Sequence, residues 1–372
     1  MTLVVAEPTY GDEEHATINA VIAGVVMPGA VALAATPRHH AALLAAAPGA
    51  ARPPAEIIDV LPPGGVTIRR MRMQWRGLAA LVARHQATRL LLLSAGPETL
   101  FVARALVARH RQLQIHAVMH GNMADLPGWR SRDPRRRWID LRAGLGIAHH
   151  PRIHLVVLED FIASAAAAGG SGWRGIANPL TVWPHPTAAE EEPVASTWAP
   201  GPRLRLTVPG VANREKGFDD VLTLAAATPQ HDWFVTGRLG SEYREGPPPM
   251  PAAPGRLSRG DYLRTLRGAD YAVLMQQPAY DLIASGSVLD CATNRVPLIA
   301  LRTPALTALF APYGAPGYLV PDIEAARALL HSLALRDPAT YARFQASLGA
   351  LHRDRTAAAL APCIRTSLGL PV

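Results

Sequence analysis

Two turns in the second half of the chain combine residue types that suit anion binding. The first lies in LTVPGVANREKGFDDVLTLA, where Arg214, Lys216 and Gly217 fall between a predicted strand and a predicted helix. Cationic side chains beside the N–H groups of a helix start form a pocket for an anion such as a diphosphate. The alternative is a basic loop in which Gly217 is an ordinary turn residue. Lys216 is the only lysine among 37 Lys and Arg residues, and this avoidance of arginine at one position favours the anion site.

The second turn lies in QQPAYDLIASGSVLDCATNRVPLIA, residues 276–300. Here Ser285, Gly286 and Ser287 precede a predicted helix. Small residues at a helix start let backbone amides approach a phosphate, and the serine hydroxyls add donors. The alternative is a plain helix cap. Asp290 comes three residues after Ser287, so it is either a capping-box partner or an acceptor for the hydroxyls of a ribose.

The first half of the chain offers two further groups of candidates. The segment EPTYGDEEHATIN contains Gly11, Glu14 and His15, and Gly11 would allow a substrate to approach the backbone closely. The acidic residues here can also be a solvated helix start, which the helix dipole favours. His120 follows the predicted strand IHAVM. It is a candidate general base or sugar-binding residue, and a structural histidine is the alternative.

Short apolar runs alternate with helical stretches along the chain, which predicts parallel sheets built from βαβ units. The predicted strands are 2–6, 31–35, 57–60, 89–94, 115–119, 153–158, 204–208, 233–236, 271–275, 297–300 and 317–320. The predicted helices include 16–26, 75–85, 97–109, 217–227, 259–268, 287–292 and 323–335. We therefore expect an α/β protein with two Rossmann-like domains whose parallel sheets face a central cleft, with ligands at the carboxyl ends of the strands.

The second half also resembles a known family. The segments NREKGFDDVL and FVTGRLG, followed by YDLIASGSVLDCATNRVPLIA, look like the donor-binding domain of the two-domain GT-B glycosyltransferases, near the family-4 group. The resemblance covers residues 204–300, and the first half fits more loosely. It implies an acceptor-binding domain at 1–184, a proline-rich linker at 185–203 and a nucleotide-sugar donor domain at 204–337. A helical tail at 338–372 would pack back on the first domain.

The resemblance implies a role for each candidate residue. The donor diphosphate and sugar would contact Arg214, Lys216, Gly217, Ser285, Gly286 and Ser287, the ribose Asp290, and the acceptor Gly11, Glu14 and His15. His120 would be the catalytic residue, near the reacting sugar.

The sequence departs from the family pattern at two positions. The first Glu of the family's E-x7-E pattern falls near Leu282, where no Glu stands, and the glycine of its G-x-P is Arg295. These departures leave retaining or inverting chemistry open.

Charge and composition limit the classes of partner that we expect the protein to bind. The formal net charge is +8, and part of it lies in the run Arg130 to Arg137. A peripheral membrane contact, a nucleotide diphosphate or a solvated face each explains this run. No zinc-finger spacing or aromatic-interleaved RNA-binding signature accompanies it, so we expect no nucleic-acid partner. The acidic first residues differ from the basic start of a secretory signal, so we expect a cytoplasmic protein, peripheral at the inner membrane if the run binds lipid.

We expect no metal and no cofactor. The two cysteines, Cys291 and Cys363, are too few for a disulfide framework, and neither Asp-x-Asp nor a histidine cluster with ligand spacing occurs. The expected activity is a metal-independent hexosyltransferase that moves a sugar from a nucleotide-diphosphate sugar to a glycan, lipid-linked or protein acceptor, as in bacterial polysaccharide biosynthesis. A sugar-nucleotide epimerase or phosphorylase and a non-catalytic partner subunit of a glycosylation assembly remain open.

Overall fold

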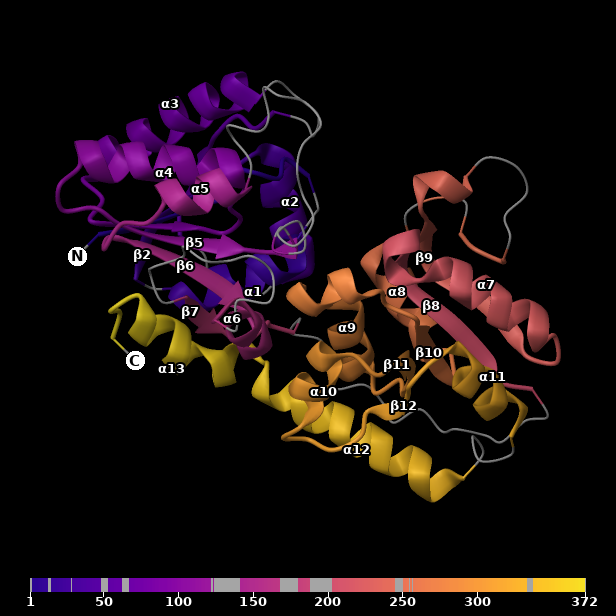
Figure 1. Cartoon of the computed structure of the whole chain (residues 1–372). Coiled ribbons are helices and arrows are strands. Elements are labelled where there is room, and N and C mark those ends of the chain that lie inside the picture. Colours follow the sequence, from indigo (N-terminus) through magenta and orange to yellow (C-terminus); the bar gives the residue numbers. More distant parts are fainter. Residues whose placement is uncertain are drawn as a thin grey trace. The chain divides into compact units, whose positions relative to one another are not determined.

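The structure is a computed structural model that describes residues 2–12, 15–27, 29–47, 53–61, 67–121, 123, 141–167, 180–187, 203–244, 250–253, 255, 257–332 and 337–371. The chain divides into two compact units (Figure 1). Unit 1 comprises Met1–Ala189, Leu282–Ala284 and Arg355–Val372, and unit 2 comprises Glu190–Asp281 and Ser285–Asp354.

Unit 1 is built on a seven-stranded sheet in the order β3-β2-β1-β4-β5-β6-β7, with every neighbouring pair parallel. Its strands are β1 (Leu3–Ala6), β2 (Ala30–Ala35), β3 (Ala55–Ile57), β4 (Arg89–Leu92), β5 (Gln114–Met119), β6 (Ile153–Leu158) and β7 (Thr181–Trp183). The central strands are apolar on both faces, and all four residues of β1 are buried. This pattern is typical of a parallel sheet that helices cover on both sides.

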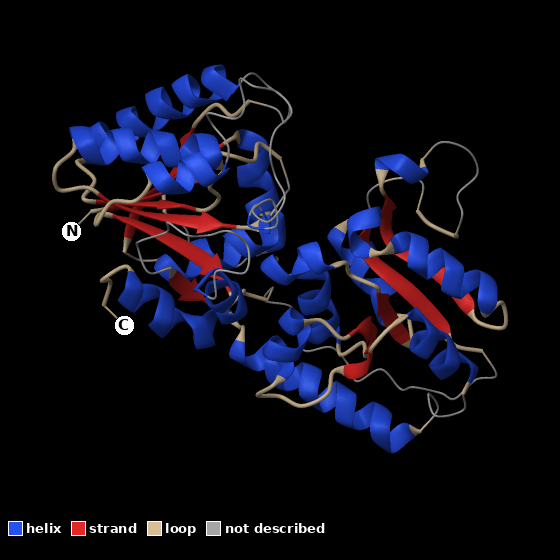
Figure 2. Ribbon diagram, in the orientation of Figure 1, coloured by secondary structure: helices blue, strands red, loops and turns tan. Residues whose placement is uncertain are grey.

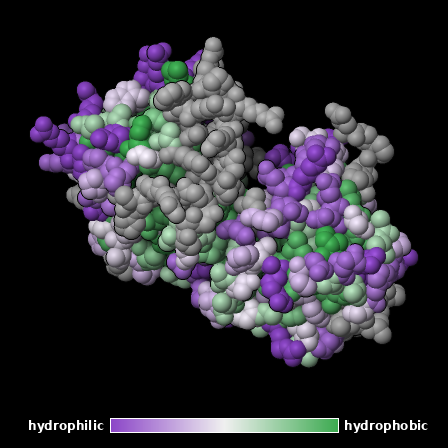
Figure 3. Space-filling model, viewed as in Figure 1, coloured by the Kyte–Doolittle hydropathy of each residue, from purple (hydrophilic) through white to green (hydrophobic). Residues whose placement is uncertain are grey.

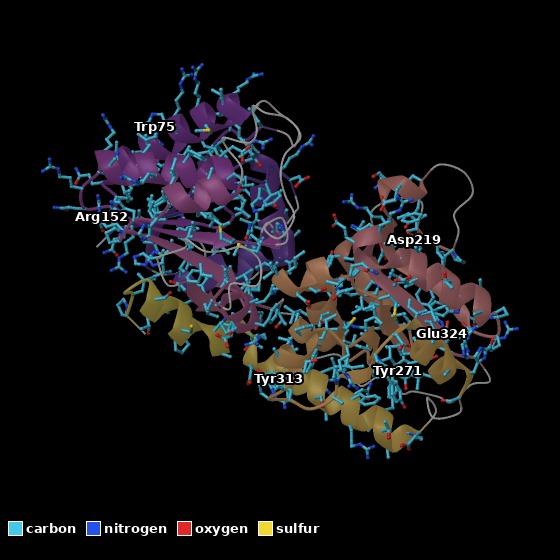
Figure 4. All side chains as sticks on the ribbon, viewed as in Figure 1. Trp75, Arg152, Asp219, Tyr271, Tyr313 and Glu324 are labelled. Carbon is cyan, nitrogen blue, oxygen red and sulfur yellow. The ribbon has the colours of Figure 1, made fainter. Side chains whose placement is uncertain are left out.

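Helices pack on both faces of this sheet (Figure 2). One face carries α3 (Thr67–His85), α4 (Pro97–Arg109), α5 (Leu141–Ile147) and α6 (Asp160–Ala167). The other face carries α1 (Ala16–Val26), α2 (Pro37–Ala46) and α13 (Ala357–Ser367). Trp75 of α3, labelled in Figure 4, packs against the core on the first of these faces.

Helix α13 is hydrogen-bonded to residues that lie far from it in the sequence. The Arg365 guanidinium donates to the carbonyls of Val25 and Met27 at 3.1 and 2.7 Å, where α1 ends. The hydroxyl of Ser367 accepts from the indole of Trp183 at 2.9 Å. The C-terminal segment is therefore an integral part of unit 1.

Unit 2 is built on a five-stranded parallel sheet in the order β12-β11-β10-β8-β9. Its strands are β8 (Arg205–Ala212), β9 (Asp232–Leu239), β10 (Tyr271–Leu274), β11 (Leu298–Leu301) and β12 (Gly317–Val320). Its α-helices are α7 (Phe218–Ala227), α8 (Arg259–Arg267), α9 (Gly286–Asn294), α10 (Pro304–Phe310), α11 (Ile323–His331) and α12 (Pro338–Asp354). Helices α7 and α11 pack on one face, α8, α9 and α10 on the other, and α12 contributes to both cores.

The predicted α/β fold class with two Rossmann-like units is confirmed. In detail, β3 lies at Ala55–Ile57 instead of 57–60, and the short strand β7 was not predicted. The helical tail is split, because α12 belongs to unit 2 and α13 to unit 1. Within the expected linker, His185 and Thr187 are buried in unit 1, and residues 188–202 lie outside the described part of the chain.

The surface of unit 2 in the view of Figure 3 mixes hydrophilic side chains with smaller apolar areas. None of the helices in the described part of the chain combines the length and the apolar character that crossing a bilayer requires. The arginine run at 130–137 lies outside the described residues, so its predicted membrane contact stays a prediction.

Candidate functional site

The two predicted turns of unit 2 meet at one point. The 3-10 helix Arg214–Lys216 follows β8, and the Asn213 side chain caps it by accepting from the Lys216 amide at 3.0 Å. The Lys216 ammonium donates to the hydroxyl of Ser287, at the start of α9, at 3.0 Å. That hydroxyl in turn donates to the carbonyl of Pro209 at 3.2 Å. The lysine and the ASGS turn are therefore two parts of one site.

Two glycines make room for this meeting. Gly210 has a φ of 80°, and a Cβ there would lie 2.7 Å from the Ser287 hydroxyl and 2.9 Å from the Lys216 ammonium. Gly217 has a φ of 69°, and a Cβ there would lie 1.7 Å from the carbonyl oxygen of Met275. Both positions need the left-handed backbone and the missing side chain of glycine. We predicted Gly217 and missed Gly210, although the Pro-Gly pair in LTVPGVAN is a turn signal.

The cation of this site is the Lys216 ammonium. Burial lowers the pKa of Lys216 to about 8, and the negative charge of Asp290 opposes this shift. No carboxylate of a described residue forms an ion pair with the Lys216 ammonium. An anion at this position would therefore meet an ammonium that forms no direct ion pair with a described carboxylate, although Asp290 acts on it from further away.

The start of α9 adds donors to the same site. The N-cap hydroxyl of Ser285 makes no capping bond and accepts from the Gln276 side chain at 3.0 Å. Within the described part of the chain, the backbone N–H groups of Gly286 and Ser287 have no acceptor. Unpaired N–H groups at a helix start carry partial positive charge and bind anions.

Two other residues that were predicted to bind the nucleotide sugar have protein partners in the structure. Arg214 is exposed, and its guanidinium lies 3.5 Å from the carboxylate of Asp219 at the start of α7. Asp219 is labelled in Figure 4. Asp290 lies on α9 and accepts from the Arg259 guanidinium at 2.6 Å. The ion pair between Asp290 and Arg259 was not predicted. The ribose role of Asp290 stays a prediction.

In unit 1, polar side chains gather where the strands end. All are buried, with at most 6% of their surface exposed: Glu7 after β1, Ser94 after β4, His120 after β5, Glu159 after β6 and His185 after β7. The carboxyl ends of parallel strands lie at one edge of a sheet, where ligands of α/β proteins bind.

His120 is buried beneath His15. Its Nε2 lies 2.8 Å from the carbonyl of Leu93, and because a carbonyl only accepts, Nε2 must carry the proton. The rings of His15 and His120 stack with centroids 4.2 Å apart. Burial lowers the pKa of His15 to about 4 and that of His120 well below its ordinary value, so both are neutral at neutral pH.

The catalytic role of His120 stays a prediction, and His15, which is half-buried, is the more accessible ring. The carbonyl of Gly11 accepts from the Thr36 hydroxyl at 2.6 Å. Gly11 and His15 thus lie in the loop and helix start that follow β1. Glu14 lies outside the described residues.

Two buried carboxylates in unit 1 were missed by the sequence analysis. Burial raises the pKa of Glu7 and that of Glu159 to about 7 each. Glu159 has a φ of 130° and accepts from the His185 amide at 2.9 Å and the Arg355 guanidinium at 3.0 Å. In the sequence each is an acidic residue directly after a buried strand, Glu7 alone and Glu159 followed by Asp160. Among the described residues, no group of three or more His, Cys, Asp or Glu side chains could hold a metal ion.

Two helix-covered parallel sheets define the GT-B fold, and comparison with solved structures supports this class. Anabaena HepE in complex with UDP-glucose is 11% identical, with a TM-score of 0.68 over 99% of each chain. Sucrose-phosphate synthase from Thermosynechococcus elongatus is 15% identical, with a TM-score of 0.68 over 99% of this chain and 97% of that one. A proposed UDP-N-acetylglucosamine 2-epimerase from Listeria monocytogenes is 14% identical, with a TM-score of 0.59 over 99% and 96%.

These likenesses show that the chain has the GT-B fold. No protein-family model matches the chain. No curated protein matches it in sequence.

Proposed function

We propose that the chain is a glycosyltransferase that moves a sugar from a nucleoside-diphosphate sugar to an acceptor hydroxyl. The observation that carries this proposal is the Lys216 ammonium beside Ser287, at a helix start whose first N–H groups have no acceptor among the described residues. A diphosphate bound here would receive hydrogen bonds from the lysine and from the N–H groups of Gly286 and Ser287.

The same groups would serve the chemistry. When the sugar leaves its donor, negative charge develops on the diphosphate. Fixed donors that already point at this position stabilise that charge without reorganising. In this proposal Lys216 and the start of α9 take the part that a metal ion plays in other transferases, so the enzyme is metal-independent. Arg214, exposed next to the turn, adds a second positive charge.

The acceptor side of the proposal uses unit 1. The neutral imidazole of His15 can take the proton of an acceptor hydroxyl, and His120 holds that ring by stacking on it. Gly11 and Glu14 belong to the same acceptor side. The acceptor is a glycan, a lipid-linked sugar or a protein.

A thermal-shift and calorimetric screen against UDP, GDP and TDP tests the donor assignment, because a ligand that binds only the folded state raises its stability. We expect one nucleotide to bind the wild type and to bind Lys216→Ala much more weakly. Arg203→Ala is the matched control, since Arg203 is an exposed cation of the same unit that pairs with Asp232 instead. Equal binding by wild type and Lys216→Ala would refute the site.

The fold is also that of a proposed UDP-sugar epimerase, so the products decide between the two activities. A transferase needs an acceptor and releases the nucleoside diphosphate, whereas an epimerase converts the nucleotide sugar without an acceptor. Incubation of nucleotide sugars with and without acceptors, followed by chromatography, separates these outcomes. Nucleotide binding without either product would indicate a non-catalytic subunit.

A further inference from the structure

Side chains of described residues hold the backbone of the loop that follows β1, Pro8 to Asp12. The Gln74 amide donates to the carbonyl of Pro8 at 2.9 Å, and His39 Nδ1 lies 2.6 Å from the carbonyl of Asp12. The Thr36 hydroxyl binds the Gly11 carbonyl. Loop backbone on a protein surface ordinarily bonds to water, so this many protein partners fix the loop in one conformation.

Glu7 is the centre of this arrangement. One carboxylate oxygen, Oε1, accepts from the amides of Thr9 and Tyr10 at 2.9 and 3.0 Å. The other, Oε2, accepts from the Asn19 side chain at 2.8 Å and the Ser94 hydroxyl at 2.6 Å. A single buried carboxylate thus joins the loop to the start of α1 and to the end of β4.

A second connection runs from Glu7 to the far end of the loop. His39 Nδ1 must donate to the Asp12 carbonyl, because a carbonyl only accepts. Its Nε2 therefore accepts from the side-chain NH2 group of Asn19, which lies 3.3 Å away and also donates to Glu7. His39 is the titratable group next in the network, and burial lowers its pKa. Asn19 and Ser94 carry no charge.

The stability of the fold alone does not explain why a carboxylate is buried at Glu7. Burying a carboxylate is costly, and no ion pair with a described residue offsets the cost. All four partners of Glu7 donate to it, and two of them are amides of the loop itself. The carboxylate therefore organises the loop backbone.

We propose that Glu7 is a positioning residue for the acceptor: it holds the loop from Pro8 to Asp12 in the one conformation that the acceptor meets. This inference rests on the proposed function, which assigns Gly11 and His15 to the acceptor side. Glu7 acts through the loop and does not touch the substrate.

Hydrogen exchange of the peptide that covers residues 8–12 tests the positioning without any substrate. In Glu7→Ala the Thr9 and Tyr10 amides lose their acceptor, and we expect them to exchange about 10-fold faster or more. Glu7→Gln keeps an acceptor oxygen for both amides but turns an NH2 group toward the Asn19 donor, so its exchange should lie between that of Glu7→Ala and that of the wild type. The matched control is Glu98→Gln, which should leave the exchange of the loop unchanged. Glu98 is a half-buried carboxyl on α4 that pairs with Arg70.

Should Glu7→Ala fail to fold, Ser94→Ala serves as the second variant. It removes one of the four donors and leaves the carboxylate in place, so the loop should loosen in the same direction by less. Loop exchange that is unchanged in every foldable variant would overturn the proposal.

Transfer kinetics test the link to the acceptor, with UDP-glucose as donor and methyl β-D-glucoside as acceptor probe. We expect Glu7→Ala to raise the KM for the acceptor probe about 10-fold and to leave the KM for UDP-glucose unchanged, with partial rescue by Glu7→Gln. A faster-exchanging loop with an unchanged acceptor KM would overturn the acceptor role. If the wild type neither binds UDP nor consumes any nucleotide sugar, the proposed function fails, and the exchange result still decides whether Glu7 positions the loop.

Discussion

The Lys216 ammonium lies 3.0 Å from the Ser287 hydroxyl, although the two residues are 71 positions apart in the sequence. Through this pair the turn after β8 and the start of α9 form one site. The site is crowded at Gly210, where a Cβ would lie 2.7 Å from the Ser287 hydroxyl and 2.9 Å from the Lys216 ammonium.

Replacement of Lys216 is therefore expected to weaken nucleotide binding. Lys216→Ala removes one charge-assisted hydrogen bond to the diphosphate, which should raise the Kd for the nucleoside diphosphate about 10- to 100-fold. Lys216→Arg should also bind more weakly than the wild type, because a planar guanidinium on a longer side chain does not reproduce the geometry of a compact ammonium beside Ser287. Isothermal titration calorimetry measures both, and wild-type affinity in Lys216→Arg would show that charge alone suffices.

Gly210→Ala is expected to destabilise unit 2 and to damage the site. The new Cβ would lie 2.9 Å from the Lys216 ammonium, on a residue with a φ of 80°. We expect a loss of about 1–3 kcal/mol in the free energy of unfolding, together with weaker nucleotide binding. The control is Gly260→Ala on α8, where a Cβ would meet open space. Denaturant unfolding of both variants should show a loss for Gly210→Ala only.

The buried carboxyl of Glu7 is expected to make stability depend on pH. Burial raises its pKa from 4.5 to about 7, so the folded protein binds this proton more tightly than the unfolded chain. The stabilising contribution is fully present below pH 4.5 and is lost as the pH rises through about 7. A shift of this size corresponds to about 3 kcal/mol.

Glu7→Gln cannot ionise, so this part of the pH dependence should disappear in the variant. Urea unfolding of wild type and variant from pH 4.5 to 8 measures it. Parallel curves for the two proteins would contradict the assignment, and Glu98→Gln should follow the wild type.

The stacked histidines should affect how activity depends on pH. We expect the activity to fall on the acid side only at a pH far below the pKa of an ordinary imidazole. Burial lowers the pKa of His15 to about 4, so His15 should stay neutral and able to accept a proton down to about pH 5. NMR titration of the His15 ring protons checks the value directly. If His15 is the base, His15→Ala should lower kcat about 100-fold or more, whereas His40→Ala on the adjacent helix α2 should not. A titration of His15 near pH 6.5 would contradict its burial.

The sequence predicted the parts of the structure that depend on local pattern. Apolar runs marked most strands, and the turn with Lys216 and the ASGS segment were each recognised from neighbouring residue types. Features that depend on distant partners were missed. Asp290 pairs with Arg259, 31 positions earlier, and Glu7 binds Ser94, 87 positions later. A glutamate after a strand is ordinarily exposed, and only the three-dimensional arrangement shows the donors that allow its burial.

The attachment of α13 determines when unit 1 can finish folding. Arg365 binds the carbonyl of Val25 across 340 positions of sequence, and Leu360, Ile364 and Leu368 complete the core beneath α1. During synthesis on the ribosome, the core beneath α1 therefore stays incomplete until residues 357–368 have emerged. Unit 2 ends at Asp354 and can be complete before that moment. Unit 2 can thus complete its core before unit 1 although most of unit 1 is synthesised first, and part of the apolar core beneath α1 lacks its α13 partners in the meantime.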